Sequence, residues 1–398
     1  MTSSLEHPPR AGARLSRRVS GIGSMRLAGL MRLAAEIGAI DIALGIPPGE
    51  PPAEAVRAAT GALTGGRNQY APPEGLLALR ETIAELARRH RGVSVDPATE
   101  VTITCGATEG VLNALLAVTD PGDEVVLFEP FYENYPGMIE LAGAVARPVP
   151  LDGPGWRLDL AAVRAALTPR TRAVLLNTPH NPTGRAFDED EVAGLLELCA
   201  RHGLVLITDE VYEGYVYDGR RHVSPLGRPG AGEHAIVVGS LSKSLQMSGW
   251  RLGYCLASPA LTAAVRRVHE RTTVGAPGPL QVGAAAVDVA SLADDSASFQ
   301  RRRDHLVDRL AELGLTVARP EGGWFVLAAV DTLGRPSDLL AEELVRSAGV
   351  LVAPGTSFFT DPAGGRRWVR MTFVRDGGRT EEALDRMRKF LSGGHHDR

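Results

Sequence analysis

The chain has 398 residues, of which 44% are hydrophobic and 23% are charged, as is usual for soluble globular proteins. Its formal net charge of −4 gives no electrostatic reason to expect nucleic acid or a membrane as a partner. No apolar stretch approaches the roughly 20 residues that a transmembrane helix needs. The three cysteines, Cys105, Cys199 and Cys255, form no metal-binding or redox spacing. We therefore expect a cytoplasmic protein without a metal site.

The N-terminal segment is rich in arginine. Residues 1–35 contain six arginines and a single acid, Glu6, a composition that could be mistaken for a targeting signal. Charged residues interrupt the region where such a signal would be apolar. We instead expect residues 1 to about 15 to be poorly ordered on their own, and the following residues to form an arm that docks on a dimer.

Apolar runs alternate with helical stretches before residue 290. We predict strands over the runs 101–104, 124–128, 173–177, 204–208, 235–240 and 252–257. Such alternation predicts an α/β fold with a mainly parallel sheet sandwiched by helices.

Near residue 290 the pattern changes to long charged helices and amphipathic strands. Ser298–Leu313 and Arg379–Leu391 are examples of these helices. We therefore predict three parts: an arm with the first part of a small domain (1–45), a large domain (46–289) and a C-terminal small α+β domain (290–398).

The first predicted strand leads into a turn of small residues and then into a helix from Glu109 to Val118. Free backbone amides and the positive end of a helix dipole make such a junction an anion site. Gly106, Ala107 and Thr108 are therefore candidates for binding a phosphate. Any strand–turn–helix unit offers this arrangement, so the assignment depends on the segments that follow.

Two further candidate segments follow predicted strands. Asn181 lies in a loop that prolines make rigid, and its amide can donate a hydrogen bond to a phenolic oxygen. An ordinary Asn-Pro turn is the alternative. Asp209 ends the next strand, and Tyr212 follows three residues later. Asp209 could keep the pyridine nitrogen of a bound ligand protonated. The Tyr212 hydroxyl could donate a hydrogen bond to the same phenolic oxygen of that ligand as Asn181 does. Asp209 could also cap a helix.

The segment from Ser240 to Tyr254 places a lysine three residues after a serine and an arginine eight residues further on. A lysine amine forms a Schiff base with an aldehyde, and hydroxyl and guanidinium groups bind phosphate. Pyridoxal 5'-phosphate carries both groups. We therefore predict this cofactor on Lys243, with Ser240, Ser242 and Arg251 at its phosphate. A nearby arginine and a dry pocket would lower the pKa of Lys243, as suits a general base.

Together these segments resemble the class I and II aminotransferases of the fold-type I pyridoxal-phosphate superfamily, over about residues 41–391. The resemblance implies that Gly45, in Leu-Gly-Ile-Pro, meets the substrate carboxylate, together with Asn181. It implies that Tyr132, in Pro-Phe-Tyr, stacks on the cofactor ring. It also implies that Arg370, in Trp-Val-Arg, clamps the α-carboxylate. Tyr70, in Tyr-Ala-Pro-Pro-Glu-Gly, resembles the tyrosine that reaches a neighbour's phosphate, which implies a homodimer.

The implied reaction moves an amino group between an L-amino acid and a 2-oxo acid. Dicarboxylate-specific relatives carry a second arginine in a region where this chain has none, between Arg271 and Arg301. The substrate pocket would be lined by Ile22 and Gly23 of the arm, Tyr132 and residues near 273–279, which favours a neutral or aromatic amino acid. The C-terminal stretch resembles the kynurenine/methionine/glutamine branch. Arg26 could instead favour an anionic side chain.

Two other classes remain open. The same cofactor frame supports β-lyases, cyclases and synthases that do not transaminate. A ligand-sensing domain of a regulator is the second alternative. The complete set of Lys243, Asp209 and Arg370 favours an enzyme over a sensor. The adjacent His395 and His396 are expected at the surface rather than on a metal.

Overall fold

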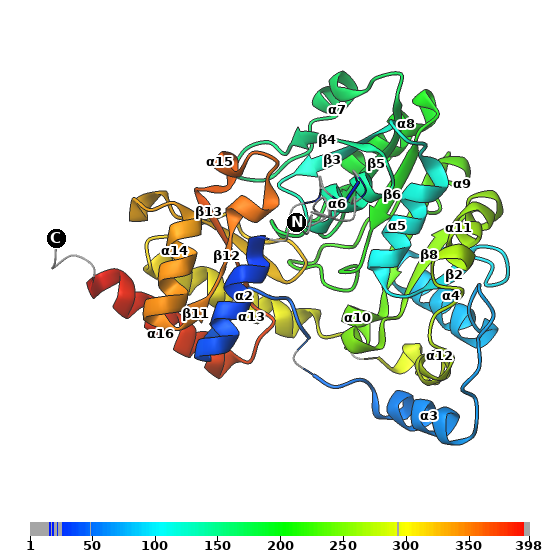
Figure 1. Ribbon diagram of the computed structural model, residues 1–398, viewed down its shortest axis with the longest axis horizontal. Coiled ribbons are helices and arrows are strands. Elements are labelled where there is room, and N and C mark those ends of the chain that lie inside the picture. Colours follow the sequence, from blue (N-terminus) through cyan, green and yellow to red (C-terminus); the bar gives the residue numbers. More distant parts are fainter. Residues whose placement is uncertain are drawn as a thin grey trace, which may run out of the picture.

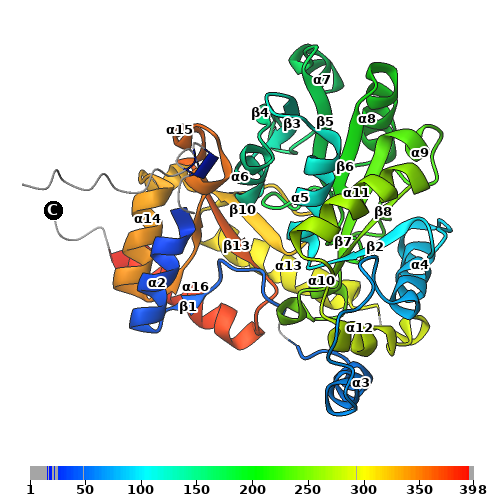
Figure 2. The same ribbon diagram turned by 45° about the vertical axis from the view of Figure 1, so that its right-hand side comes forward.

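The computed structural model describes residues 16, 18, 19, 22, 26–47, 49–292 and 294–393. Two sheets organise this part of the chain, one in the right half of Figure 1 and the other in the left half. The two sheets are also separate from each other in the view of Figure 2. Residues 1–15, which we expect to be poorly ordered on their own, lie outside the described residues.

The larger sheet has seven strands in the order β2-β8-β7-β6-β5-β3-β4. The pairs from β4 to β7 are parallel, and β8 is antiparallel to both of its neighbours. This confirms the predicted α/β fold with a mainly parallel sheet. The strands are β2 (Val101–Thr104), β3 (Glu124–Glu129), β4 (Val145–Pro150), β5 (Thr171–Asn177), β6 (Val205–Asp209), β7 (Ala235–Ser240) and β8 (Gly253–Ala257).

Helices cover both faces of this sheet, as side chains that alternate along the strands require. Val125 and Leu127 of β3 pack in the cluster that contains α5, α6 and α11, whereas Val126 and Phe128 pack in the cluster that contains α7 and α8. The third cluster places α4 against β2 and β8. These helices are α4 (Leu77–Arg91), α5 (Ala107–Val118), α6 (Asn134–Leu141), α7 (Leu160–Ala166), α8 (Glu189–His202) and α11 (Pro259–Thr272).

The smaller sheet is antiparallel and has the order β12-β13-β10-β9. Its core includes Leu306 of α13, Leu340 of α14 and Leu384 of α16. The elements are α13 (Ser296–Glu312), β9 (Thr316–Val317), β10 (Phe325–Ala329), α14 (Ser337–Glu343), β12 (Ala353–Pro354), β13 (Trp368–Thr372) and α16 (Gly377–Gly393).

The N-terminal segment joins this smaller part. In Figure 1, α2 (Arg26–Ile37), in blue, lies beside the orange elements of the C-terminal region. β1 (Ile40–Asp41) pairs in parallel with β11 (Val350–Leu351). The remaining α-helices are α3 (Ala53–Thr64), α9 (Ala231–His234), α10 (Leu241–Ser244), α12 (Gly278–Ala285) and α15 (Pro362–Gly365).

Within the described residues, no helix combines the length and the apolar character that crossing a membrane requires. The three cysteines are free thiols, and Cys199 and Cys255 are buried.

Candidate active site

The candidate residues gather where the parallel strands of the large sheet end. Asp209 is the last residue of β6 and Ser240 the last of β7, and these strands are neighbours in the sheet. Asn177 ends β5 on the other side of β6. Ligands of open α/β sheets bind at this carboxyl edge. The fold therefore brings together segments that are more than 60 residues apart in the sequence.

A cavity of about 400 Å³ lies at this edge, within the size range of ligand sites. It is lined by most of the candidate residues predicted from the sequence. These are Gly45, Ala107, Thr108, Tyr132, Asn181, Asp209, Tyr212, Ser240, Ser242, Lys243, Arg251 and Arg370.

Lys243 lies on the short helix α10, directly after β7. Its Nζ donates a hydrogen bond of 2.7 Å to the backbone oxygen of Gly45 and lies 4.8 Å from the centre of the Trp324 ring. Burial lowers the pKa of Lys243 to about 8, with Arg370 and Arg251 acting in the same direction and Asp209 opposing them. A buried amine with this pKa is partly unprotonated near neutral pH, which a nucleophile or a general base requires.

Asp209 is buried, and burial raises its pKa to about 6. Two hydrogen bonds oppose that shift: the Tyr135 hydroxyl donates to Oδ2 at 2.7 Å and the Val211 amide donates to Oδ1 at 3.3 Å. The chain turns after Asp209 instead of entering a helix, so its carboxylate caps none. A buried carboxylate of this kind fits a cationic partner in the cavity, such as a protonated ring nitrogen.

Asn177 fixes the position of the loop that contains Asn181. Its Nδ2 donates to the backbone oxygen of Asp209 at 2.9 Å, and its Oδ1 accepts from the backbone amide of Asn181 at 2.7 Å. Tyr212 lines the same cavity. The amide of Asn181 and the hydroxyl of Tyr212 are thus both held at one cavity.

The start of α5 lies beside Arg251. Gly106 precedes α5 with a φ of +81°, and a Cβ there would lie 2.3 Å from Nη2 of Arg251. Only glycine therefore lets the turn approach this guanidinium so closely. Arg251 donates to the backbone oxygen of Ser248 at 2.9 Å and has no acid partner among the residues that the structure describes. An unpaired arginine beside a helix N-terminus fits the phosphate of the expected cofactor.

Arg370 is a buried cation in the wall of the cavity. Nη1 donates to Oδ1 of Asn181 and Nη2 to the backbone oxygen of Ala43, each at 2.9 Å, whereas Nε is buried without a partner. Its guanidinium carbon lies 4.2 Å and 4.7 Å from the ring centres of Phe325 and Phe358. Burial lowers the pKa of Arg370. In the described part of the chain no carboxylate pairs with it, so the site fits an anionic ligand.

Three of the candidates that the structure describes, Gly106, Ile22 and Tyr70, do not line this cavity. Gly106 lies against the guanidinium of Arg251. Ile22 lies against α6, where a Cβ at Gly137 would be 3.6 Å from one of its methyl carbons. Gly23 lies outside the described residues. Tyr70 is 89% exposed and is not among the residues that line the cavity of its own chain.

Sequence reasoning missed several residues that line the cavity. Tyr135 had a detectable signal, because it is an aromatic residue three positions after the candidate Tyr132, and the centres of the two rings lie 5.3 Å apart. Glu133 had none, since a single acid beside an aromatic residue predicts no role. The other missed residues are Met31, Leu44, Ile46, Val111, Met138, Asn177, Val211, Ser248 and Phe325.

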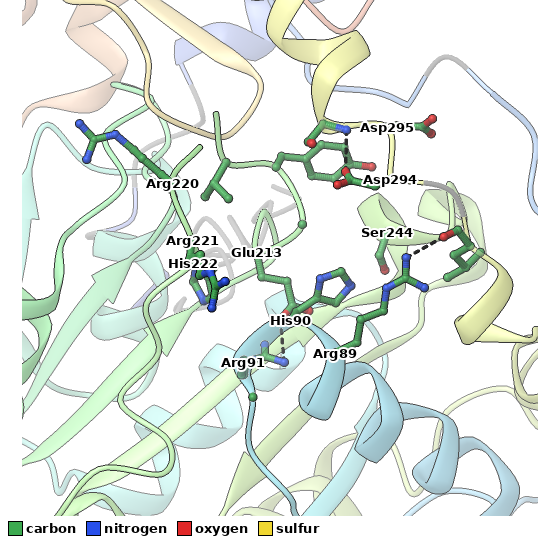
Figure 3. A pocket seen from close by; sticks show the side chains of 16 residues that line it. Arg89, His90, Arg91, Glu213, Arg220, Arg221, His222, Ser244, Asp294 and Asp295 are labelled. Carbon is green, nitrogen blue, oxygen red and sulfur yellow. Dashed lines mark hydrogen bonds and ion pairs between the residues drawn. The ribbon is translucent and has the colours of Figure 1, made fainter. Parts of the chain in front are cut away.

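A second cavity, of about 620 Å³, is lined by residues that include Arg91, Glu213 and His222 (Figure 3). Arg91 is buried there, with Nε 2.7 Å from Glu210 Oε2 and Nη1 2.7 Å from Glu213 Oε2. His222 Nε2 lies 2.8 Å from Glu210 Oε2. The ligand atoms of Glu210, Glu213 and His222 lie within 4.8 Å of one another, but Arg91 already pairs with both carboxylates. This ion network anchors the backbone next to Asp209.

Comparisons with known proteins extend these findings. The family model for aminotransferase class I and II matches residues 38–387. A probable N-succinyldiaminopimelate aminotransferase of Mycobacterium tuberculosis is 39% identical over 89% of this chain and 93% of its own. The methionine aminotransferase of Escherichia coli is 32% identical over 93% and 96%. The solved structure of N-succinyldiaminopimelate aminotransferase from Mycobacterium tuberculosis has a TM-score of 0.89 and 37% identity, covering 95% of this chain and 100% of that one.

Proposed function

We propose that this chain, which belongs to the aminotransferase class I and II family, moves an amino group between a neutral or aromatic L-amino acid and a 2-oxo acid. It is an aminotransferase that depends on pyridoxal 5'-phosphate. When bound, this cofactor supplies an aldehyde that receives the amino group and a ring that accepts electrons. The observation that carries the proposal is one cavity lined by an amine of lowered pKa, Lys243, and an unpaired buried cation, Arg370.

The proposed roles of the residues follow from their contacts. Lys243 would hold the cofactor until the amino group of the substrate displaces it, and the freed Nζ would then take the proton from the α-carbon of the amino acid and return it later. Arg370 binds the α-carboxylate, because its free Nε and forked guanidinium match a planar anion. That clamp also orients the Cα–H bond, which matters as much for the rate as affinity does.

The remaining groups are proposed to hold the cofactor. Asp209 pairs with its ring nitrogen, and Asn181 and Tyr212 donate to its phenolic oxygen. The residues proposed at its phosphate are Gly106, Ala107, Thr108, Ser240, Ser242 and Arg251. Tyr132 is proposed to stack on the ring, and Gly45 to meet the substrate carboxylate beside Lys243 Nζ.

Product release without an acceptor tests the reaction type. With an amino acid but no 2-oxo acid, the loaded enzyme should release about one 2-oxo acid per active site and then stop, because the amino group stays on the enzyme. Adding a 2-oxo acid should restart turnover. The measurement is rapid-quench quantification of the released 2-oxo acid over a panel of amino acids. Continuous release without an acceptor would identify a lyase or another non-transaminating enzyme instead.

We also propose that the active form is a cytoplasmic homodimer in which Tyr70 completes the phosphate site of the neighbouring subunit. The exposure of Tyr70 and its absence from the residues that line its own cavity support this assignment. The three free thiols suit a reducing compartment.

Mixed dimers test the role of Tyr70. Tyr70→Ala subunits and Lys243→Ala subunits should each have little activity as homodimers. After mixing and subunit exchange, activity should return, because one site of the mixed dimer then contains Lys243 from one chain and Tyr70 from the other. The measurement is turnover of the mixture against each variant alone, with sedimentation to verify the dimer. Lack of recovery in a proven mixed dimer would mean that Tyr70 serves its own subunit.

A further inference from the structure

Glu133 is an acid in the wall of the active-site cavity to which the proposed function assigns no role. It lies at the start of α6, next to Tyr132, and shares the cavity with the apolar side chains of Met31 and Met138. The Oε2 atom of Glu133 is buried and has no hydrogen-bond partner in the described part of the chain. Burial raises the pKa of Glu133. A buried acceptor without a partner costs about 1–3 kcal/mol, so its retention needs an explanation.

A structural role within α6 does not explain this position. Glu133 occupies the N-cap of the helix, where a carboxylate normally accepts from a backbone amide of the first turn. Its side chain makes no such bond. Arg370 is close enough to lower the pKa of Glu133, but the two side chains form no ion pair. Within the described residues, the usual intramolecular partners of a buried carboxylate are therefore missing, and no protein group holds the Glu133 carboxylate away from a ligand in the cavity that it lines.

The charges of the cavity point to the substrate as that ligand. On the proposed function, Arg251 meets the cofactor phosphate, Arg370 the α-carboxylate, and Asp209 the ring nitrogen. Glu133 is then the one charged side chain lining the cavity, among those that the structure describes, with no assigned partner. Ile22 of the arm lies against Gly137, one helical turn further along α6. The part of the substrate still without a polar contact is its side chain.

We propose that Glu133 selects amino acids whose side chain ends in a hydrogen-bond donor, an N–H or O–H group, over apolar side chains of the same shape. The apolar walls accommodate the stem of such a side chain, and the carboxylate of Glu133 accepts from its tip. Neutral donors, such as an amide or a phenol, and a cationic ammonium share this chemistry. The inference rests on the proposed function: among neutral and aromatic side chains it selects those with a donor at the tip, and it adds cationic side chains that end in an ammonium group.

Matched pairs of amino acids test this inference, since the members of each pair differ mainly by the donor. The pairs are tyrosine and phenylalanine, glutamine and methionine, and lysine and norleucine. The holoenzyme should favour the donor-bearing member of at least one pair by roughly 10- to 100-fold in kcat/KM, because the apolar member leaves the carboxylate unpaired. A neutral pair would identify an amide or phenol substrate, and the lysine pair a cationic one.

Glu133→Met removes the acceptor at similar length and should abolish that preference. Glu140→Met, on the same helix but outside the cavity lining, is the matched control and should retain it. Competitive inhibition by 3-(4-hydroxyphenyl)propanoate and 3-phenylpropanoate reports binding without turnover. If the enzyme prefers tyrosine to phenylalanine, the wild type should also bind the hydroxyl-bearing inhibitor more tightly, and Glu133→Met should lose that difference. Should Glu133→Met fail to fold, Glu133→Gln replaces it. Glu133→Gln should lose a preference for lysine over norleucine, or show a reduced preference for a neutral donor-bearing side chain.

A preference that survives in Glu133→Met, or its absence from the wild-type enzyme, would overturn the role of Glu133. That result would leave transamination standing, because alanine, phenylalanine and methionine would still release 2-oxo acid. Failure of every amino acid to release a 2-oxo acid would instead overturn the proposed function itself.

Discussion

Replacing Lys243 by alanine should abolish amino transfer, with a fall in kcat of at least about 10⁴-fold, because the change removes both the attachment point and the general base. The fold should survive, since within the described residues Nζ makes a single hydrogen bond, to the Gly45 oxygen. Steady-state turnover with added cofactor measures the loss, and circular dichroism verifies the fold.

Lys389 provides the control for this prediction. It is the only other lysine of the chain, it lies on α16, and it does not line the cavity. Lys389→Ala should therefore have normal turnover. Borohydride treatment of the wild-type enzyme followed by peptide mapping should leave the cofactor on the peptide that contains Lys243. Label on the Lys389 peptide would contradict the assignment, as would a Lys243→Ala enzyme with substantial turnover.

Much of the large sheet could be predicted because its strands are buried on both faces and appear as continuous apolar runs. The predicted strands agree with the observed bounds to within two residues. β4 was missed for a physical reason. It lies at the edge of the sheet, is partly exposed, and contains Arg147 and two prolines, which an edge strand tolerates and an interior strand does not.

Most of the site could be predicted because its residues lie in short segments whose order resembles a known family. The contacts between those segments could not. Tyr135 donates to Asp209 across 74 positions of sequence, and Arg91 pairs with Glu210 across 119. Local patterns contain no information about such pairings, which depend on how α4, α6 and β6 pack. The domain boundaries near residues 45 and 290 and the role of Tyr70 stay predictions.

Asp209→Asn is the second change with a large expected effect. It keeps the shape of the side chain but removes the charge proposed to hold the cofactor ring protonated. Without that charge the ring accepts electrons poorly, and kcat should fall by roughly 10²–10³-fold or more. Single-turnover kinetics with saturating cofactor separate this loss from weaker cofactor binding. Near-normal turnover would contradict the proposed role.

Asp209→Asn should lower turnover, but it should not lower the stability of the cofactor-free protein near pH 7. The pKa of Asp209 is raised from its ordinary value near 4 to about 6, so the folded form holds a proton that the unfolded chain has released between these values. Its contribution to stability is present below about pH 4 and is lost as the pH rises to about 6, by at most about 3 kcal/mol. Asparagine does not ionise, and its oxygen can still accept from Tyr135. Urea unfolding near pH 7 should therefore find cofactor-free Asp209→Asn at least as stable as the wild type, whereas near pH 4 the advantage should disappear. An inactive variant that is also unstable at pH 7 would show that Asp209 maintains the fold, and the loss of turnover could then not be assigned to the ring.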